Sequence, residues 1–142
     1  MFFDRVSADF KPHREGLKKV LGDLEADIME IVWQKESVSV RDVYETLRLK
    51  RDIAYTTVMT IMGRLAEKDL LLKTTRGNAY IYSPALNKLE FTKKIVSAVI
   101  DGLMDEFREP AVSHFMDRMG KEEEEQISKL EGLIKAKKDK GE

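Results

Sequence analysis

One face of a helix that the sequence predicts over residues 54–68 carries short hydroxyl side chains and one arginine. These side chains are Thr56, Thr57, Thr60 and Arg64. The opposite face is apolar, with Val58, Ile61, Met62 and Leu65 at helical spacing. Threonine hydroxyls can bond to base edges, their methyl groups can contact thymine, and an arginine one turn away can reach a phosphate or a guanine. Because threonine is a mediocre helix former, three of them on one face favour contact with DNA over a merely solvated surface.

A second candidate DNA contact is the tight turn Arg76-Gly77-Asn78. The sequence predicts short strands over 70–74 and 79–83 on either side of it. Glycine permits the turn, and the flanking arginine and asparagine could lie along a phosphate backbone, although an ordinary hairpin would carry similar residues. Around another predicted helix, Ser39 and Arg41 could likewise touch phosphate or stay solvated. The candidate DNA-binding set is Ser39, Arg41, Tyr55, Thr56, Thr57, Thr60, Arg64, Arg76 and Asn78.

The elements that must hold these residues follow from the periodicity of the chain. Apolar spacing predicts a first helix over residues 24–33, with Asp23 as its cap, and a second helix that starts at Ser39. Asp42, three residues after Ser39, is close to a capping-box arrangement. Three helices followed by a hairpin have the order of a winged helix-turn-helix. The predicted fold class is therefore mostly α with a small β-hairpin.

The sequence divides into three parts. Residues 22–84 are the predicted winged-helix head, and residues 1–21, which lack a sustained period, are expected to be a mobile arm. Residues 85–142 are expected to form helices whose apolar stripes are too thin to be buried by the segment itself. We therefore predict a helical dimerisation region that pairs two copies of the chain. Its apolar positions are Phe91, Ile95, Val99, Leu103, Phe107, Val112, Phe115, Ile127, Leu130 and Ile134.

Charge is unevenly distributed along a chain whose formal net charge is −1. Residues 23–36 hold five acids against Lys35, whereas residues 48–76 hold seven basic residues against three acids. A local surplus of positive charge on the predicted head supports nucleic acid as a partner.

The composition excludes several classes of protein. Without cysteine the chain has no disulfide and no thiolate chemistry. No apolar stretch approaches the roughly 20 residues of a membrane span, and the N-terminal residues are a poor signal peptide, which fits a cytoplasmic protein with no membrane insertion. His13 and His114 stand apart from carboxylates at ligand spacing, so no metal or cofactor is expected. Since no nucleophile or phosphate-binding motif is present, an enzyme is not expected.

Four runs of the sequence resemble the BlaI/MecI family of penicillinase and methicillin-resistance repressors: LGDLEADIMEIVWQ, VSVRDVYETL, IAYTTVMTIMGRLAEKDLL and RGNAYIYSP. The resemblance is strong from about Leu21 to Phe107 and loose afterwards. It implies a transcriptional repressor that binds a palindromic operator as a homodimer. The positions implied in the groove are Thr56, Thr57 and Thr60, and those on the DNA backbone are Arg64 and Arg76. Residues 1–20 extend beyond the usual family start, and the cysteine-rich tail of copper-responsive relatives is absent.

The resemblance also implies how repression ends, because a membrane sensor–protease system leads to cutting of such repressors within their dimerisation helices. The matching bond here joins His114 to Phe115, although the family pattern has Asn where this chain has His114. These two residues could instead serve only as interface packing. Two other functions stay open from the sequence alone: a winged helix that docks on a protein partner, and a winged-helix regulator that responds to a small molecule.

Overall fold

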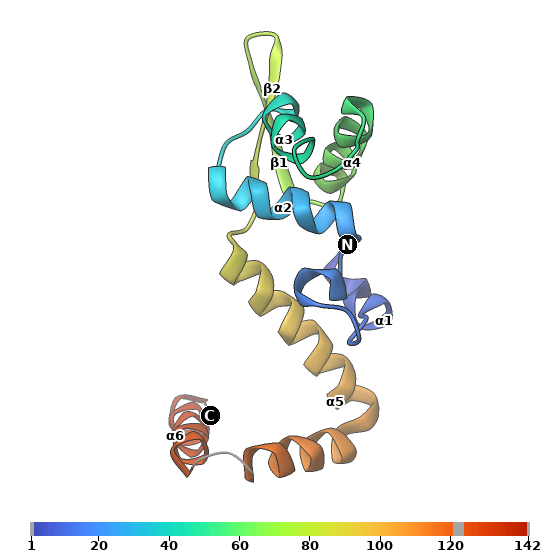
Figure 1. Cartoon of the computed structure of the whole chain (residues 1–142). Coiled ribbons are helices and arrows are strands. Elements are labelled where there is room, and N and C mark those ends of the chain that lie inside the picture. Colours follow the sequence, from blue (N-terminus) through green and yellow to red (C-terminus); the bar gives the residue numbers. More distant parts are fainter. Residues whose placement is uncertain (1, 121–123, 142) are drawn as a thin grey trace. The chain divides into compact units, whose positions relative to one another are not determined.

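The computed structural model describes residues 2–120 and 124–141, apart from the side chain of Gln126. Figure 1 shows the chain coloured along its sequence. It divides into two compact units, of which the first ends at Val99 and the second begins at Ile100.

Three helices and a hairpin form the centre of the first unit: α2 (Asp23–Lys35), α3 (Val40–Leu47), α4 (Tyr55–Glu67), β1 (Leu71–Arg76) and β2 (Ala79–Pro84). The two strands pair antiparallel, from Leu71 opposite Pro84 to Arg76 opposite Ala79. The loop before α3 adds one bridge to this ladder, because Val38 and Tyr82 exchange backbone hydrogen bonds of 2.9 and 2.7 Å. This arrangement is a winged helix-turn-helix, so the predicted fold class is confirmed.

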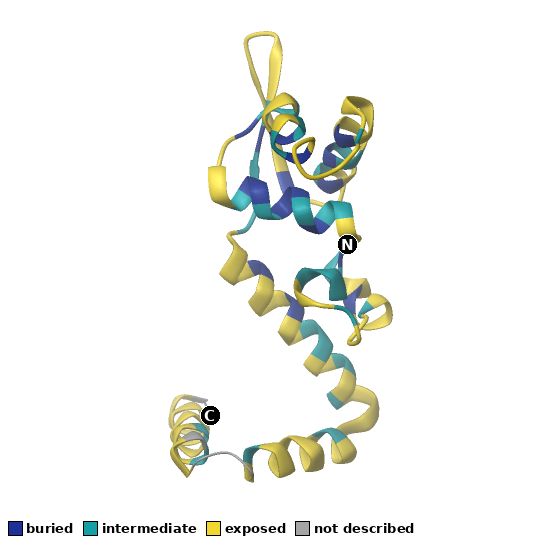
Figure 2. Ribbon diagram, in the orientation of Figure 1, coloured by how far each residue is buried: buried dark blue, intermediate teal, exposed yellow. Residues whose placement is uncertain are grey.

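The core of this head is formed by the apolar faces that the periodicity predicts. Fully buried side chains come from all three helices: Ile28, Val32, Val43, Val58, Met62 and Leu65. Leu71 and Tyr82, at the base of the hairpin, close the core. Toward its tip the hairpin is exposed on both faces (Figure 2). The core therefore holds α4 by one side and leaves the other side free.

The starts of α2 and α3 are set by side chains. Ser39 Oγ accepts a hydrogen bond from the Asp42 amide at 3.1 Å, and Asp42 Oδ2 accepts one from the Ser39 amide at 2.9 Å, which confirms the predicted capping box. The bond from the Ser39 amide lowers the pKa of Asp42 below its ordinary value. Its stabilising effect is present above the unfolded-state pKa and is lost as the pH falls through the lowered one. Helix α2 begins after Gly22 rather than at an Asp23 cap, because Glu25 Oε1 accepts the Gly22 amide at 3.1 Å.

Residues 2–21, for which the sequence predicted a mobile arm, are folded in the structure. They include the short helices η1 (Phe3–Arg5), α1 (Val6–Asp9) and η2 (Gly16–Lys19). Val6 is 2% exposed and Leu21 is 4% exposed, so both belong to the core of the first unit. None of these helices is long enough to give a periodic pattern, and the residues that bury them lie far along the chain.

The long helix α5 (Lys88–Gly120) is bent at Phe107, where the backbone takes φ −131° and ψ 45°. Pro110 explains the bend, because it offers no amide hydrogen to the Glu106 carbonyl and its ring crowds that carbonyl. Helix α6 (Glu124–Gly141) follows. The first unit extends beyond the predicted boundary at residue 84, because it includes α5 up to Val99.

Phe91 and Ile95 are core residues of the first unit, which corrects their predicted place in a dimer interface. Phe91 is 1% exposed and Ile95 is 8% exposed. The rings of Phe2, Phe3 and Trp33 lie with their centroids 5.9, 5.7 and 5.4 Å from that of Phe91. The apolar stripe correctly indicated burial here, but it could not show that the covering residues come from the same chain.

Candidate nucleic-acid interface

The polar side chains predicted on α4 are exposed together: Thr56, Thr57, Thr60 and Arg64. Successive residues of an α-helix are turned by about 100°, so Thr56 and Thr60 lie opposite the buried face and Thr57 and Arg64 lie beside them. None of the four side chains hydrogen-bonds or ion-pairs with any residue that the structure describes. Their polar groups are therefore free to bind something outside the chain.

Met59 belongs to the same surface and was not in the predicted set. It is 47% exposed and lies one turn before Gly63, next to the threonines. An exposed methionine there offers apolar contact, which in a major groove suits the thymine methyl group. Helical spacing from Thr56 could have identified it, but its apolar character pointed to the core. Tyr55, which begins α4, is 42% exposed and its ring meets that of Tyr44 edge-on at 5.5 Å.

Gly63 lies in the middle of α4, at a position where this chain shows no structural need for glycine. It does not take a positive φ, and a Cβ added to it would meet nothing within 4 Å. A glycine inside a helix costs about 0.5–1 kcal/mol relative to alanine. Neither the backbone nor the packing of the described residues requires a glycine at this position, which lies on the face of α4 that carries Thr56 and Thr60.

Helix α3 has two of the predicted DNA-contact residues, Ser39 and Arg41, at its start. Ser39 Oγ accepts the cap hydrogen bond from the Asp42 amide, so only its hydroxyl proton remains to donate outward. Arg41 is exposed and has no ion-pair partner among the described residues. A phosphate contact is therefore available from Arg41, and Ser39 can donate its hydroxyl proton to a phosphate while its oxygen caps the helix.

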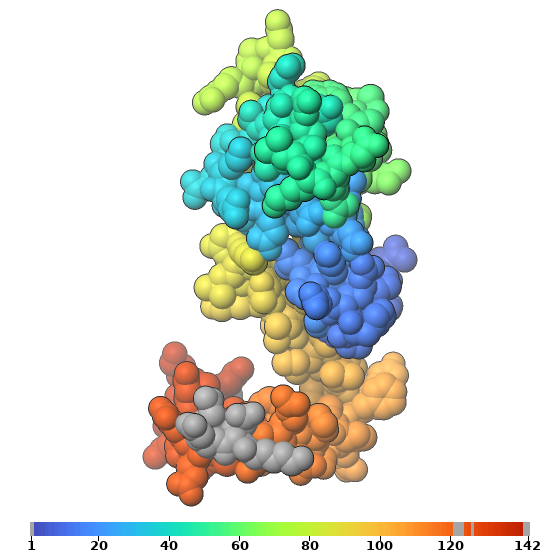
Figure 3. Space-filling model, in the orientation of Figure 1, coloured from blue at the N-terminus to red at the C-terminus, as the bar shows by residue number. Residues whose placement is uncertain are grey.

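The tip of the hairpin projects beyond α3 and α4, as Figure 3 shows. Gly77 has φ 63°, a left-handed value that favours glycine, and Asn78 does not. Positive φ at the first of two loop residues is the pattern of a type II′ hairpin turn. Arg76 and Asn78 are exposed beside it, and the Lys73 ammonium lies 4.0 Å from the centre of the Tyr80 ring. The β1–β2 hairpin, which is the wing of the winged helix, thus carries cations along its length.

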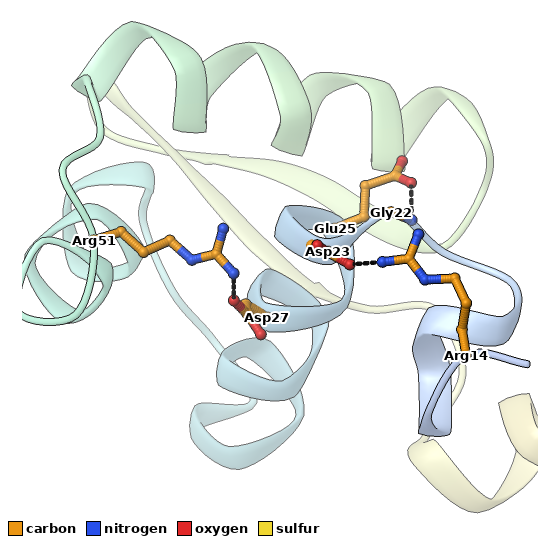
Figure 4. Close-up of polar contacts among 6 residues, drawn as sticks. All are labelled: Arg14, Gly22, Asp23, Glu25, Asp27 and Arg51. Carbon is orange, nitrogen blue, oxygen red and sulfur yellow. Dashed lines mark hydrogen bonds and ion pairs between the residues drawn. The ribbon is translucent and has the colours of Figure 1, made fainter.

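In contrast to the cations of the hairpin, basic residues near α2 form ion pairs with the acidic residues of that helix. Arg14 pairs with Asp23 and Arg51 with Asp27, and the Gly22 amide bonds to Glu25 (Figure 4). Lys68 and Lys88 pair with Glu25 and Glu30, each at 2.7 Å. These exposed pairs add little stability individually, but they join α2 to four other parts of the first unit.

The ion pairs sort the basic residues of positions 48–76 into two groups. Arg48, Arg51 and Lys68 each have an acidic partner. Within the part of the chain that the structure describes, Lys50, Arg64, Lys73 and Arg76 form no ion pair. The uncompensated positive charge thus includes cations on α4 and the hairpin, where the threonine face also lies.

The part of α5 that lies in the second unit carries a groove of about 860 Å³. Its lining is mostly apolar: Ile100, Leu103, Met104, Ala111, Val112, His114, Phe115, Arg118 and Met119. Leu103, Phe107, Val112 and Phe115 are 46, 58, 42 and 49% exposed. Of the predicted positions on α6, Ile134 is 49% exposed and Ile127 and Leu130 are half-buried. The second unit therefore exposes apolar residues at the predicted dimerisation positions from Leu103 onward.

Over residues 2–120 and 124–141, no group of three or more histidines, cysteines or acids could hold a metal ion. No helix in these ranges is long and apolar enough to cross a membrane.

Comparison with known proteins relates most of the chain to one family. A family model described as penicillinase repressor matches residues 21–136. The transcriptional regulator BlaI of Mycobacterium tuberculosis is 37% identical over 118 residues, which are 82% of this chain and 86% of that protein. The penicillinase repressor of Staphylococcus aureus is 25% identical over 79 residues, or 56% of this chain and 63% of that protein.

A solved relative is Bacillus licheniformis BlaI, whose monomeric form was determined in complex with the blaP half-operator. It is 24% identical with a TM-score of 0.43, and the match covers 48% of this chain and 83% of that one. The region matched by the family model begins at residue 21, so the folded segment before it is additional to that region.

Proposed function

Because the chain belongs to the penicillinase repressor family, we propose that it represses transcription as a homodimer bound to a palindromic DNA operator in the cytoplasm. The observation that carries the proposal is the exposed face of α4. Its threonines and Arg64 have no partner among the described residues, and α4 is the helix that a winged helix-turn-helix inserts into the major groove. In this proposal Thr56, Thr57, Thr60 and Met59 face base edges.

The phosphate contacts come from the residues around this face. Arg64 lies at its edge, Arg41 and Ser39 at the start of α3, and Arg76 and Asn78 at the tip of the wing. Contacts of this kind position a protein on the duplex without reading its sequence. Tyr55 is half exposed beside them and extends the same surface.

Two substitutions distinguish residues that contact base edges from residues that contact the phosphate backbone. Thr60→Ala is expected to weaken the operator by about 1–3 kcal/mol and to leave random DNA nearly unchanged, because base contacts carry the discrimination. Arg76→Ala is expected to weaken both DNAs alike and to lower the salt dependence of binding, because a phosphate contact releases a counterion on any sequence. Affinities for an operator selected in vitro and for random duplex, at several salt concentrations, measure both effects.

Thr92→Ala, an exposed threonine on α5, is the matched control and should change neither affinity. If Thr60→Ala lowers the affinity for the operator and for random DNA equally, the assignment of the threonines to the major groove is wrong. Absence of any salt-dependent DNA binding in the unaltered chain would instead favour a protein-docking winged helix.

Gly63→Ala is expected to change stability and binding in opposite directions. The added methyl group meets no atom of the chain, so the free energy of unfolding should rise by about 0.5–1 kcal/mol. The same methyl group stands on the face that approaches DNA, so operator affinity should fall by about tenfold, comparable with one lost base contact. Urea unfolding and a shift assay on the same preparation measure the two effects.

Gly132→Ala in α6 is the control, because that glycine also has open space around it. It should raise stability without lowering operator affinity. Unchanged affinity in Gly63→Ala would mean that this turn of α4 stays away from the DNA.

The homodimer is supported by the second unit. The apolar side chains of Leu103, Phe107, Val112, Phe115 and Ile134 are between 42 and 58% exposed in the single chain, and an apolar patch of this kind marks an interaction site. A second copy would bury the same residues on both chains, as a two-fold interface requires. Pairing there places two α4 helices on two half-sites about one or two DNA turns apart, with roughly 34–36 Å per turn.

For the end of repression we propose hydrolysis of the His114–Phe115 peptide bond by a sensor–protease system, as the family resemblance implies. His114 is exposed and Phe115 is 49% exposed in the single chain. The bond lies inside helix α5, so a protease reaches it only after local opening of that helix. Cutting there detaches α6 and the last turns of α5 from the head.

A further inference from the structure

The segment of residues 2–21, called the N-terminal segment below, packs against the start of α5. The Phe2 and Phe3 rings contact Phe91 at 5.9 and 5.7 Å between centroids. Val6 is 2% exposed in the same core cluster as Ile95. The Ser7 hydroxyl donates a hydrogen bond to the Ala98 carbonyl at 2.8 Å. These contacts hold one side of α5 from its first turn to the end of the first unit.

The same segment is fastened to the winged-helix head. Its backbone closes on itself through the Lys11 amide, which donates to the Lys19 carbonyl at 2.7 Å. Arg14 forms an ion pair with Asp23 at the start of α2 (Figure 4). Leu21, which ends the segment, is 4% exposed in the head's core. The N-terminal segment therefore spans the junction between the head and α5.

Without this segment, fewer contacts would join α5 to the head. The Trp33 ring lies tilted against the Phe91 ring, with 5.4 Å between centroids, and Trp33 Nε1 donates to the Leu86 carbonyl at 2.8 Å. Lys88 adds an exposed ion pair to Glu30. All of these lie within the first turn of α5 or before it, so they fix where the helix begins. Further along α5, the N-terminal segment makes the hydrogen bond from Ser7 to the Ala98 carbonyl, and the Lys94 ammonium lies 5.5 Å from the centre of the Phe3 ring.

We propose that the N-terminal segment fixes the direction in which α5 leaves the head and thereby sets the half-site spacing that the homodimer recognises. The inference rests on the proposed function, since only a dimer reads a spacing. It concerns residues that precede the region matched by the family model. Helix α5 links the first unit to the dimerisation residues, and its backbone is helical from Val99 up to Phe107.

The physical basis is effective concentration. When the two heads are held at one separation, binding of the first head places the second at its half-site with high effective concentration. A loose junction spreads the second head over many positions, which lowers the affinity for the best spacing and raises it for others. The affinity of one head for one half-site does not depend on this junction.

Val6→Asp in the full chain tests the proposal, because a carboxylate at a buried position undocks the segment. Ala8→Asp adds the same charge two residues away at an exposed position and is the matched control. The chain has one tryptophan, and Trp33 contacts Phe91, so its fluorescence reports whether the aromatic cluster has opened. DNA probes carry one half-site selected in vitro, or two copies at separations increased one base pair at a time from one helical turn.

The unaltered chain and Ala8→Asp are expected to bind one spacing at least about tenfold more tightly than a separation five base pairs longer. Val6→Asp is expected to remain a dimer by light scattering, to bind the single half-site within about twofold of the control, and to bind both separations within about threefold of each other. An unchanged spacing preference with altered Trp33 fluorescence would overturn the proposal. Equal loss on the single half-site and the paired site would do the same, because it would place the segment in the DNA contact itself.

Two results keep this test separate from the proposed function. If the unaltered chain is a monomer, or binds paired half-sites no more tightly than one, the proposed homodimer is contradicted, and this is known before the variants are compared. If Val6→Asp does not fold, Phe3→Ala combined with Ser7→Ala removes a ring contact and the bond to Ala98 without burying a charge. That variant is expected to show the same loss of spacing preference, and a preference equal to that of the unaltered chain would overturn the proposal.

Discussion

A chain that ends at Val99 is expected to bind the operator at least about a hundredfold more weakly than the full chain, because two-headed binding gives an avidity of that order or more. The fragment keeps the whole first unit, including Phe91 and Ile95, so the head should remain folded. It loses all of the exposed apolar positions that we assign to the homodimer interface. Light scattering should give a monomer, and a single half-site should be bound as tightly as by the full chain.

Leu103→Asp in the full chain places a charge on the apolar groove and should have the same effect without truncation. Ser97→Asp adds that charge to an exposed position earlier on the same helix and should leave the dimer intact. A dimeric fragment ending at Val99 would show that the first unit carries the interface, and the assignment of the second unit would be wrong.

The cleaved repressor is expected to behave as an intermediate case. A chain ending at His114 keeps Ile100, Leu103 and Val112 but loses Phe115, Met119 and α6. Its operator affinity should fall between that of the full chain and that of the chain ending at Val99, with a loss of about tenfold or more as the dimer weakens. Titration of the three chains on one operator gives the order directly.

Mass spectrometry of protein recovered from induced host cells connects this series to repression. Fragments 1–114 and 115–142 are the expected species. Intact chain recovered alongside full derepression would mean that induction acts by another route, and His114 and Phe115 would then be interface residues only.

Sequence periodicity was sufficient for the winged-helix head. The helices α2 to α4 repeat apolar residues at helical spacing. The hairpin was predicted from Gly77 in the turn and from the alternating pattern of residues in the strands on either side of it. Burial of Val58, Met62 and Leu65 then forces Thr56 and Thr60 outward, so the exposed face of α4 followed from the same pattern. The period of the secondary structure alone determines which residues share a face of a helix or strand.

The N-terminal segment could not be predicted in this way. Its helices have three or four residues, which is too short for a period, and it is held by contacts with Phe91 and Ala98 far along the chain. For the same reason Phe91 looked like a dimer residue: an apolar stripe shows that something covers it, not what does. Charge counting had a similar limit, because only the folded structure shows that Arg51 and Lys68 are already paired.

Met59 and Gly63 were missed for a different reason. Neither residue has a polar side chain that could bind a base or a phosphate, so neither entered the candidate set. The structure shows that Met59 is exposed rather than packed in the core, and that the space around Gly63 is open.

The bend at Phe107 has a consequence for how long each molecule survives in the cell. No described residue from Ile100 onward is fully buried in the single chain, and Pro110 interrupts the helix that could otherwise extend order from the first unit. Short helices without a buried face are marginal in water, so a lone copy should open there and be degraded by general proteolysis, while a paired copy is protected. We therefore expect the lifetime of the repressor to rise with its own copy number. As growth dilutes it below the level that sustains pairing, turnover should accelerate, and genes under its control should switch on more abruptly than dilution alone would produce.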